Sequence, residues 1–105
     1  MKEITVQELK TKLDRAEEIQ LIDVREENER EFTHIGGDHI SMGSVMQNLD
    51  KIQKDKDVVI YCRSGSRSGQ IISFLEMNHG FENLYNLKGG ILAWADEIDS
   101  TIKKY

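Results

Sequence analysis

Short apolar runs alternate with segments of helical spacing along the whole chain. The clearest run, Val58-Val59-Ile60-Tyr61, predicts a strand over 57–61. A second compact run predicts a strand over 20–24 that is buried on both faces, as strands of parallel sheets are. Three shorter strands are also predicted: an edge strand that begins at Ile4, one near Ile40, and one over 84–87.

Apolar residues spaced by three and four positions predict helices between these strands. Val6, Leu9 and Leu13 share one helical face, and Thr5 with Glu8 matches a capping box at its start. This order of elements predicts an α/β fold with three layers, in which a central, mainly parallel five-stranded sheet is flanked by helices. The remaining helices are predicted over 26–32, 44–52, 67–78 and 91–98.

Single residues mark the end and the buried face of these helices. Gly80 follows the helix over 67–78 at the position of a C-cap. The apolar stripe of the same helix includes Phe74, which we expect in the core together with Trp94. The other members of that stripe are Ile71, Ile72 and Leu75.

Length, composition and charge narrow the class of protein. The 105 residues have the size of one domain, so we expect a single domain over 1–105. Hydrophobic residues make up 38% and charged residues 31% of the chain, which is typical of a globular protein with a hydrated surface. The net charge of −5 and the lack of a basic stripe argue against nucleic-acid binding.

Location and redox state also follow from the sequence as expectations. The first residues lack the apolar run of a signal peptide, and no stretch approaches transmembrane length, so we expect no membrane association. Cys62 is the only cysteine, which excludes an intramolecular disulfide and a Cys-x-x-Cys pair. We therefore expect the protein in the reducing cytoplasm. If Cys62 is exposed, we expect it to oxidise readily into a disulfide-linked dimer.

The segment after the clearest strand carries the candidate chemistry. Cys62 ends the run, a short loop rich in glycine, serine and arginine follows, and then a helix begins. Ligands of parallel α/β proteins bind outside the carboxyl ends of the strands, which is where this loop is expected. Gly65 can adopt a positive φ, and the small side chains allow a tight turn. The small residues of the loop are Ser64, Gly65, Ser66 and Ser68.

A loop of this kind predicts an anion cradle around the thiol. Its backbone N–H groups can point inward, and the following helix adds the positive end of its dipole. Arg63 and Arg67 supply positive charge and forked hydrogen-bond donors. All these features favour a thiolate, so we expect a lowered pKa for Cys62. The alternative is an inert buried cysteine beside two solvated arginines.

The loop Cys62-Arg63-Ser64-Gly65-Ser66-Arg67 resembles the Cys-Arg-x-Gly-x-Arg active loop of thiosulfate-type rhodaneses. Leu21-Ile22-Asp23-Val24-Arg25-Glu26 is similar to the early Asp-x-Arg strand of this family. The segment Glu31-Phe32-Thr33-His34-Ile35 through Ile40 resembles its His-Ile-Pro-Gly-Ala region. Leu87-Lys88-Gly89-Gly90-Ile91-Leu92-Ala93-Trp94 resembles its late Gly-Gly-x-x-x-Trp motif. Four motifs in the right order identify the chain as resembling single-domain rhodaneses, with their three-layer fold.

The resemblance implies a sulfurtransferase that works through a persulfide. The Cys62 thiolate would take sulfur from thiosulfate or another small anionic sulfane donor and pass it to cyanide or a thiol. Backbone N–H groups of residues 63–68 would hold the negative charge of the persulfide. Arg63 and Arg67 would bind the donor and stabilise the leaving group. Neither a metal nor an organic cofactor is needed in such a mechanism.

Two other functions remain open at this stage. Dual-specificity phosphatases resemble rhodaneses in fold, but they place five residues between cysteine and arginine, whereas four separate Cys62 from Arg67. A relay or binding module with little turnover would use the same residues as the enzyme. Such a relay would receive persulfide from a protein donor and deliver it to a protein acceptor, so its dependence on a protein partner distinguishes it.

Other residues of these motifs are expected to have structural roles. Asp23 and Arg25 predict an ion pair at the rim of the sheet, with support of the Cys62 loop as the functional alternative. No metal site is predicted, because the spacing between Cys62 and the histidines does not match that of known metal ligands. The histidines are His34, His39 and His79. His34 is expected to be structural, and His79 to lie at a helix C-terminus.

The chain has no proline, so Gly36 and Ser41 stand where relatives usually have proline. We expect a more flexible segment there and a loss of stability of up to ~1 kcal/mol per site.

Overall fold

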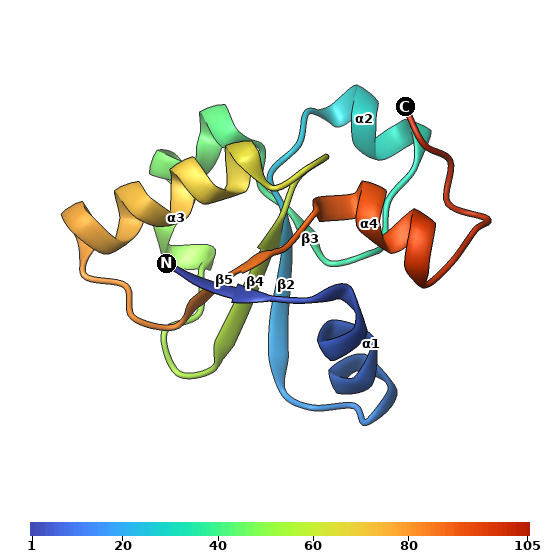
Figure 1. Cartoon of the computed structure of the whole chain (residues 1–105). Coiled ribbons are helices and arrows are strands. Elements are labelled where there is room, and N and C mark those ends of the chain that lie inside the picture. The colour runs from blue at the N-terminus through green and yellow to red at the C-terminus, as the bar shows by residue number, and fades with distance from the viewer.

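The computed structural model describes residues 1–105, and strands alternate with helices along the whole of it (Figure 1). The strands are β1 (Lys2–Ile4), β2 (Ile19–Asp23), β3 (Asp38–His39), β4 (Asp57–Tyr61) and β5 (Leu84–Leu87). The helices are α1 (Val6–Asp14), α2 (Glu27–Phe32), the 3₁₀ helix η1 (Met42–Lys51), α3 (Ser66–His79) and α4 (Gly90–Glu97).

The five strands form one parallel sheet in the order β1-β5-β4-β2-β3. The central strand β4 pairs with β2 on one side, where Val59 lies opposite Leu21, and with β5 on the other, where Ile60 lies opposite Asn86. Because all strands run in the same direction, their carboxyl ends meet at one edge of the sheet. The α/β fold with a five-stranded sheet between helices is therefore confirmed.

Each face of the sheet is covered by its own apolar core. Side chains of β4 alternate between the two faces: Val58 and Ile60 pack into the core beneath α3 and η1, and Val59 and Tyr61 into the core beneath α1 and α4. All four are at most 1% exposed, which explains why the run that they form is continuously apolar. The two layers of helices lie on opposite sides of the sheet (Figure 1).

The predicted caps are present. The Thr5 side chain accepts a hydrogen bond from the backbone of Glu8, and the Glu8 side chain accepts one from the backbone of Thr5, which completes the capping box of α1. Gly80 ends α3 in the left-handed conformation, as expected of a C-cap. Trp94 is 7% exposed and belongs to the core beneath α4, as predicted.

Some details of the predicted elements were wrong. Ile4 ends the edge strand β1 instead of beginning it. The strand near Ile40 consists of two residues and stops just before Ile40, which is buried. The helix predicted over 44–52 is the 3₁₀ helix η1, with a kink at Asn48. The amide of Asn48 donates to the backbone oxygen of Ser44, and such local bonds compete with a regular helix.

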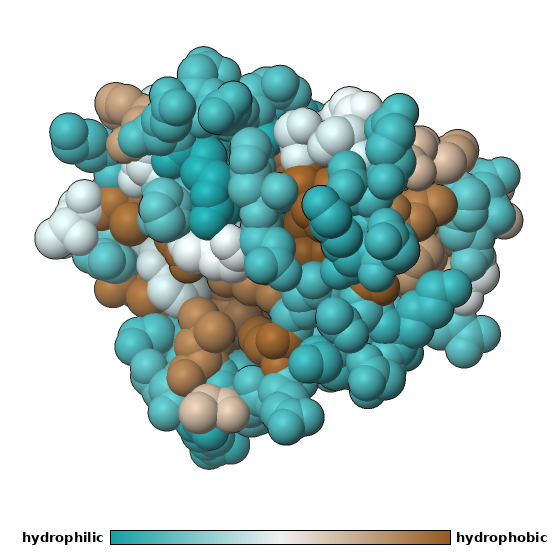
Figure 2. Space-filling model, turned by 180° about the vertical axis from the view of Figure 1, so that it is seen from behind, coloured by the Kyte–Doolittle hydropathy of each residue, from teal (hydrophilic) through white to brown (hydrophobic).

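Two apolar side chains of the predicted helical stripes lie at the surface, and one of them, Phe74, was wrongly predicted to be in the core. Phe74 is 45% exposed, because the buried face of α3 is formed by its neighbours Ile71, Ile72 and Leu75. Leu13, in the last turn of α1, is 40% exposed. With Met46 and Met77, Phe74 leaves apolar area uncovered beside η1 and α3. The opposite side of the molecule from Figure 1 is mostly hydrophilic, with apolar area gathered in its lower middle (Figure 2).

The backbone conformation differs between Gly36 and Ser41, the two positions where relatives usually have proline. Gly36 has a φ of +91°, a conformation that proline cannot adopt, since its ring holds φ near −65°. A proline at position 36 is therefore incompatible with the backbone of this chain. Ser41 has a φ of −58°, which lies within the range of proline.

None of the helices combines the length and the apolar character that a membrane span requires.

Candidate active site in the Cys62 loop

Cys62 lies at the carboxyl end of the central strand, in the turn that leads into α3. Gly65 is the N-cap of α3 and has a φ of +105°, so the predicted positive φ is present. The start of α4 holds the turn from the other side, because Ile91 N–H donates to the backbone oxygen of Cys62 at 3.0 Å. A Cβ at Gly90 would come within 2.6 Å of that oxygen, so only glycine allows this contact.

The sulfur of Cys62 lies among hydrogen-bond donors. Gly65 N–H donates to Sγ at 3.1 Å, Ser68 N–H lies at 3.5 Å, and the Ser68 hydroxyl lies at 3.3 Å. These groups belong to the first turn of α3, where backbone N–H groups lack helical partners and the helix dipole is positive. The loop therefore offers Sγ the kind of surroundings that stabilise a negative charge.

The balance of burial and hydrogen bonding lowers the pKa of the Cys62 thiol. Burial alone would raise the pKa, because Cys62 is only 1% exposed. The hydrogen bonds from Ser68, and then those from the backbone of Gly65 and Ser64, outweigh burial and favour the thiolate. The arginines contribute no hydrogen bond to Sγ. The low exposure also argues against the expected disulfide-linked dimer, because a second Cys62 has no direct access to Sγ.

A buried asparagine fixes the donors around the sulfur. Asn86 Nδ2 donates to the backbone oxygen of Gly65 at 3.0 Å, so its Oδ1 faces the Ser68 hydroxyl at 2.5 Å. A hydroxyl has one hydrogen, which Ser68 donates either to Asn86 or to Cys62. Sequence reasoning missed Asn86, although a polar residue inside a short apolar strand beside β4 was a usable signal.

Replacing Ser68 with alanine is expected to raise the pKa of Cys62. The substitution removes the hydroxyl donor and keeps the backbone N–H, a loss of about 1 kcal/mol. Alkylation of Cys62 by iodoacetamide at pH 7 should then slow about fivefold, since less thiolate is present, while the rates converge at high pH. Ser66→Ala is the matched control, because the Ser66 hydroxyl makes no hydrogen bond to Sγ. Superimposable pH profiles for Ser68→Ala and wild type would contradict this role.

The two loop arginines are engaged elsewhere. Arg67 donates to both carboxylate oxygens of Glu29, at 2.7 and 2.8 Å. Arg63 donates from Nε and Nη2 to the main-chain oxygen of Tyr105. The prediction had both arginines supply positive charge and forked donors to an anion at the thiol, and the structure pairs each with an oxygen acceptor from another part of the chain. Neither Glu29 nor Tyr105 was singled out from the sequence.

Asp23 and Arg25 form the predicted ion pair, which is fully buried. Arg25 Nε and Nη2 donate to the two oxygens of Asp23 at 2.9 and 2.8 Å, and both side chains have no exposed area. Tyr61, which precedes Cys62, donates to Asp23 Oδ2 at 3.2 Å. Arg25 also donates to the Tyr105 hydroxyl at 2.9 Å. The pair thus joins the ends of β2 and β4 with residue 105.

The histidines lie away from the sulfur and have local partners. His34 Nδ1 accepts from Gly36 N–H at 2.9 Å, and His39 Nε2 lies 2.6 Å from the backbone oxygen of Arg25. His79 is the last residue of α3, as expected. No three side chains among His, Cys, Asp and Glu are arranged to hold a metal ion.

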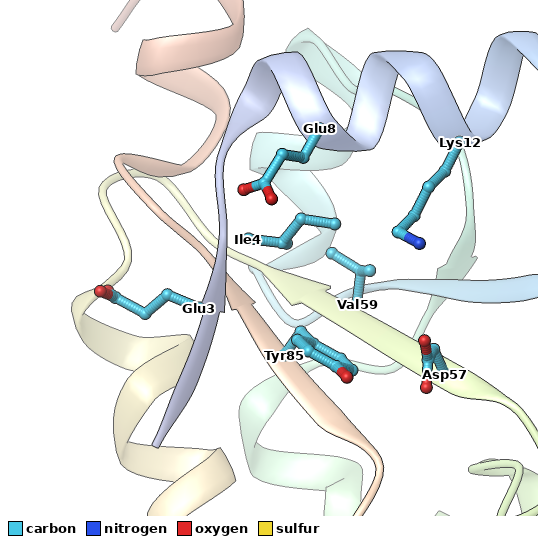
Figure 3. A pocket seen from close by; sticks show the side chains of 7 residues that line it. All are labelled: Glu3, Ile4, Glu8, Lys12, Asp57, Val59 and Tyr85. Atoms are coloured by element: carbon cyan, nitrogen blue, oxygen red, sulfur yellow. The ribbon is translucent and has the colours of Figure 1, made fainter.

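A hollow away from the Cys62 loop lies between α1 and the strands β1, β5 and β4 (Figure 3). Glu8 and Lys12 of α1 face it from one side and Tyr85 of β5 from the other. Its lining includes Asp57 and Val59 of β4 but neither Cys62 nor any residue of the loop that follows. It contains no nucleophilic thiol, and Glu8 is held by the capping box.

Comparison with known proteins agrees with this geometry. The model of the rhodanese-like domain family matches residues 5–97, so the chain belongs to this family. It is 40% identical over 98 residues to the Bacillus subtilis protein named "Putative sulfurtransferase YtwF", covering 92% of this chain and 93% of that protein. It is 39% identical over 94 residues to a protein of Allochromatium vinosum named sulfurtransferase, covering 89% and 87%.

A solved structure shows the same fold over the whole chain. The rhodanese-like domain protein from Staphylococcus aureus superimposes with a TM-score of 0.83 at 33% sequence identity, covering 100% of this chain and 99% of that one. Together with the relatives named sulfurtransferase, this likeness supports sulfur transfer as the general kind of activity.

Proposed function

We propose that this chain is a thiosulfate-type sulfurtransferase that moves sulfane sulfur through a persulfide on Cys62. The observation that carries the proposal is the sulfur itself, which accepts hydrogen bonds from the Gly65 backbone and Ser68 at the positive end of α3. The lowered pKa makes Cys62 a better nucleophile at neutral pH. The neutral hydrogen-bond donors around Sγ can also stabilise the negative charge of a persulfide after the reaction. The reducing cytoplasm would keep Cys62 in the thiol form.

In the first step the Cys62 thiolate attacks the outer sulfur of thiosulfate. A new sulfur–sulfur bond forms at Sγ, the sulfur–sulfur bond of thiosulfate breaks, and sulfite leaves with the bonding electron pair. In the second step cyanide attacks the terminal sulfur of the persulfide, thiocyanate leaves, and the Cys62 thiolate is restored. A thiol acceptor would take the sulfur in the same way, as its thiolate. Charge is conserved in each step, and no general base is needed when Cys62 is already ionised.

The loop would stabilise the persulfide by the same donors that now surround Sγ. The N–H groups of Gly65 and Ser68 stand at the start of the helix, and a terminal sulfur bound to Sγ carries a negative charge toward them. Ser64 and Ser66 would complete this ring through their backbone. Arg63 and Arg67 would bind the donor and the leaving sulfite, for which each arginine must exchange its present partner.

The experiment that tests this proposal measures thiocyanate formation from thiosulfate and cyanide. Wild-type protein should form thiocyanate in many turnovers per Cys62, and it should not hydrolyse an aryl phosphate, since the loop has four residues between Cys62 and Arg67. A lack of turnover, combined with rapid loading of Cys62 by a cysteine desulfurase that carries a persulfide, would overturn the enzyme proposal in favour of the relay. Hydrolysis of the phosphate would favour the phosphatase.

A further inference from the structure

The carboxylate of Glu29 is built into the rim of the Cys62 loop. Its two oxygens receive both arms of the Arg67 guanidinium, a forked geometry that gives strong and specific pairing. The backbone N–H of Glu26 donates to Oε2 at 2.9 Å, and the Tyr105 hydroxyl donates to Oε1 at 2.7 Å. Glu29 therefore has four hydrogen bonds and is not a mobile surface side chain.

Glu29 stays charged at every pH at which the protein would work. The hydrogen bonds from Arg67 lower the pKa of Glu29 to about 2, although burial opposes the shift. The side chain of Glu29 is 13% exposed and that of Arg67 is 32% exposed, so water screens the pair only in part. The positive charge of Arg67 is thus offset by a fixed negative charge beside it.

This pairing lies close enough to the thiol to affect what approaches it. Arg67 is the second residue of α3 and precedes Ser68, whose N–H and hydroxyl face Sγ. The hydrogen bonds that Arg67 donates to Glu29 raise the pKa of Arg67, and the nearby charge of Cys62 acts in the same direction. An anion that reaches Sγ therefore meets a neutral ion pair in place of a free cation.

We propose that Glu29 is a specificity-determining residue of the Cys62 site, because it neutralises Arg67 and thereby favours organic persulfides, which carry at most one negative charge, over the doubly charged thiosulfate as donors. The inference rests on the proposed sulfur transfer and names the donor class of the same site. The donors that face Sγ are neutral N–H and O–H groups, which suit one negative charge. A dianion gains the attraction of Arg67 only after it displaces the Glu29 carboxylate, whereas a donor with less charge has less need of the arginine.

In the preferred reaction, one sulfur atom passes from an organic persulfide to the thiolate of Cys62. The Cys62 thiolate attacks the terminal sulfur of a hydropersulfide, R–S–SH. The bond between Sγ and that sulfur forms, the sulfur–sulfur bond of the donor breaks, and R–S⁻ leaves with the electron pair. The proton stays on the transferred sulfur, so no oxidant or reductant is consumed. Thiosulfate reacts by the same displacement, but more slowly because of its second charge.

The variant that tests this role is Glu29→Gln, with Glu27→Gln as the matched control. Glutamine has nearly the same shape and still accepts from the Glu26 N–H, so the cap of α2 is kept. Glu27 is exposed on the same helix, and its replacement makes the same change in net charge without touching Arg67. Both variants are incubated with thiosulfate or with the persulfide of 2-mercaptoethanol, and sulfur on Cys62 is followed by intact mass.

Glu29→Gln is expected to raise the rate constant for loading from thiosulfate about tenfold and to change loading from the persulfide by less than about twofold. Glu27→Gln should change neither rate by more than about twofold. Equal acceleration of both donors by Glu29→Gln, or no acceleration of thiosulfate, would overturn the inference. Equal acceleration would mean that Glu29 changes the reactivity of the Cys62 thiol and does not discriminate between donors by their charge.

A second measurement separates this inference from the proposed function. Cys62 is alkylated by iodoacetate, an anion, and by iodoacetamide, which is neutral; in both reactions the Sγ–carbon bond forms as iodide leaves. The ratio of the two rates cancels any change in thiolate fraction and reports charge discrimination alone. Glu29→Gln should raise this ratio about threefold. An unchanged ratio contradicts the role of Glu29, whereas a raised ratio without sulfur loading contradicts only the proposed sulfur transfer.

Discussion

Replacing Cys62 with serine is expected to abolish sulfur transfer, with a fall in thiocyanate formation on the order of a thousandfold or more. The serine hydroxyl fits the same space among Gly65 and Ser68, so the fold should be retained. An alcohol is hardly ionised at neutral pH, however, and an alkoxide cannot store sulfane sulfur as a persulfide does. The measurement is the rate of thiocyanate formation at saturating thiosulfate, together with the melting temperature.

The control for this experiment is Ser66→Ala in the same loop. Ser66 begins α3, and its hydroxyl makes no hydrogen bond to the sulfur. This variant should keep most of the activity, which shows that the loop tolerates a small change that spares the nucleophile. Activity in Cys62→Ser comparable to wild type would mean that another group accepts the sulfur.

The largest loss of stability is expected from Asp23→Asn. This substitution removes the countercharge of Arg25, which is fully buried at the ends of β2 and β4. Breaking one partner of a buried pair typically costs about 3–5 kcal/mol, because the remaining charge has no access to water. A domain of this size is stable by about 5–15 kcal/mol, so the variant should unfold at a much lower urea concentration.

Asp14→Asn is the matched control, because it breaks an ion pair of similar length at the surface. Lys10 and Asp14 are 2.6 Å apart, but their side chains are 47% and 58% exposed. Exposed pairs of this kind contribute about 0–1 kcal/mol, so urea unfolding should change little. Equal losses of unfolding free energy in the two variants would show that burial does not determine how much the Asp23–Arg25 pair stabilises the fold.

The sheet was predictable from sequence because its central strands are buried on both faces. The ranges 57–61 and 84–87 were correct to the residue, since the apolar run of β4 ends at the Cys62 loop and β5 is followed by Lys88 and a glycine pair. The 3₁₀ geometry of η1 was not predictable, because Val45 and Ile52 fit an α-helical spacing as well as the observed helix. Phe74 shows that an apolar residue in a helical stripe need not face the core.

The candidate site was predictable where it is local in sequence and not where it depends on distant contacts. Cys62, Gly65 and Ser68 lie within seven positions, and the turn that joins them follows from small residues between a strand and a helix. The partner of Arg67 is Glu29, 38 positions away in a run of charged residues that is typical of a solvated helix face. Pairing of this kind is fixed only when α2 is placed beside the loop, and no local pattern reports it.

The intact mass of the wild-type protein after incubation with a sulfane donor tests the central claim most directly. Thiosulfate and the persulfide of 2-mercaptoethanol are each added, excess donor is removed, and cyanide is then supplied. The account predicts that wild type gains the mass of one sulfur atom, that cyanide removes it, and that Cys62→Ser gains none. Wild-type protein that gains no sulfur from either donor, or sulfur that remains on Cys62→Ser, would contradict a persulfide on Cys62.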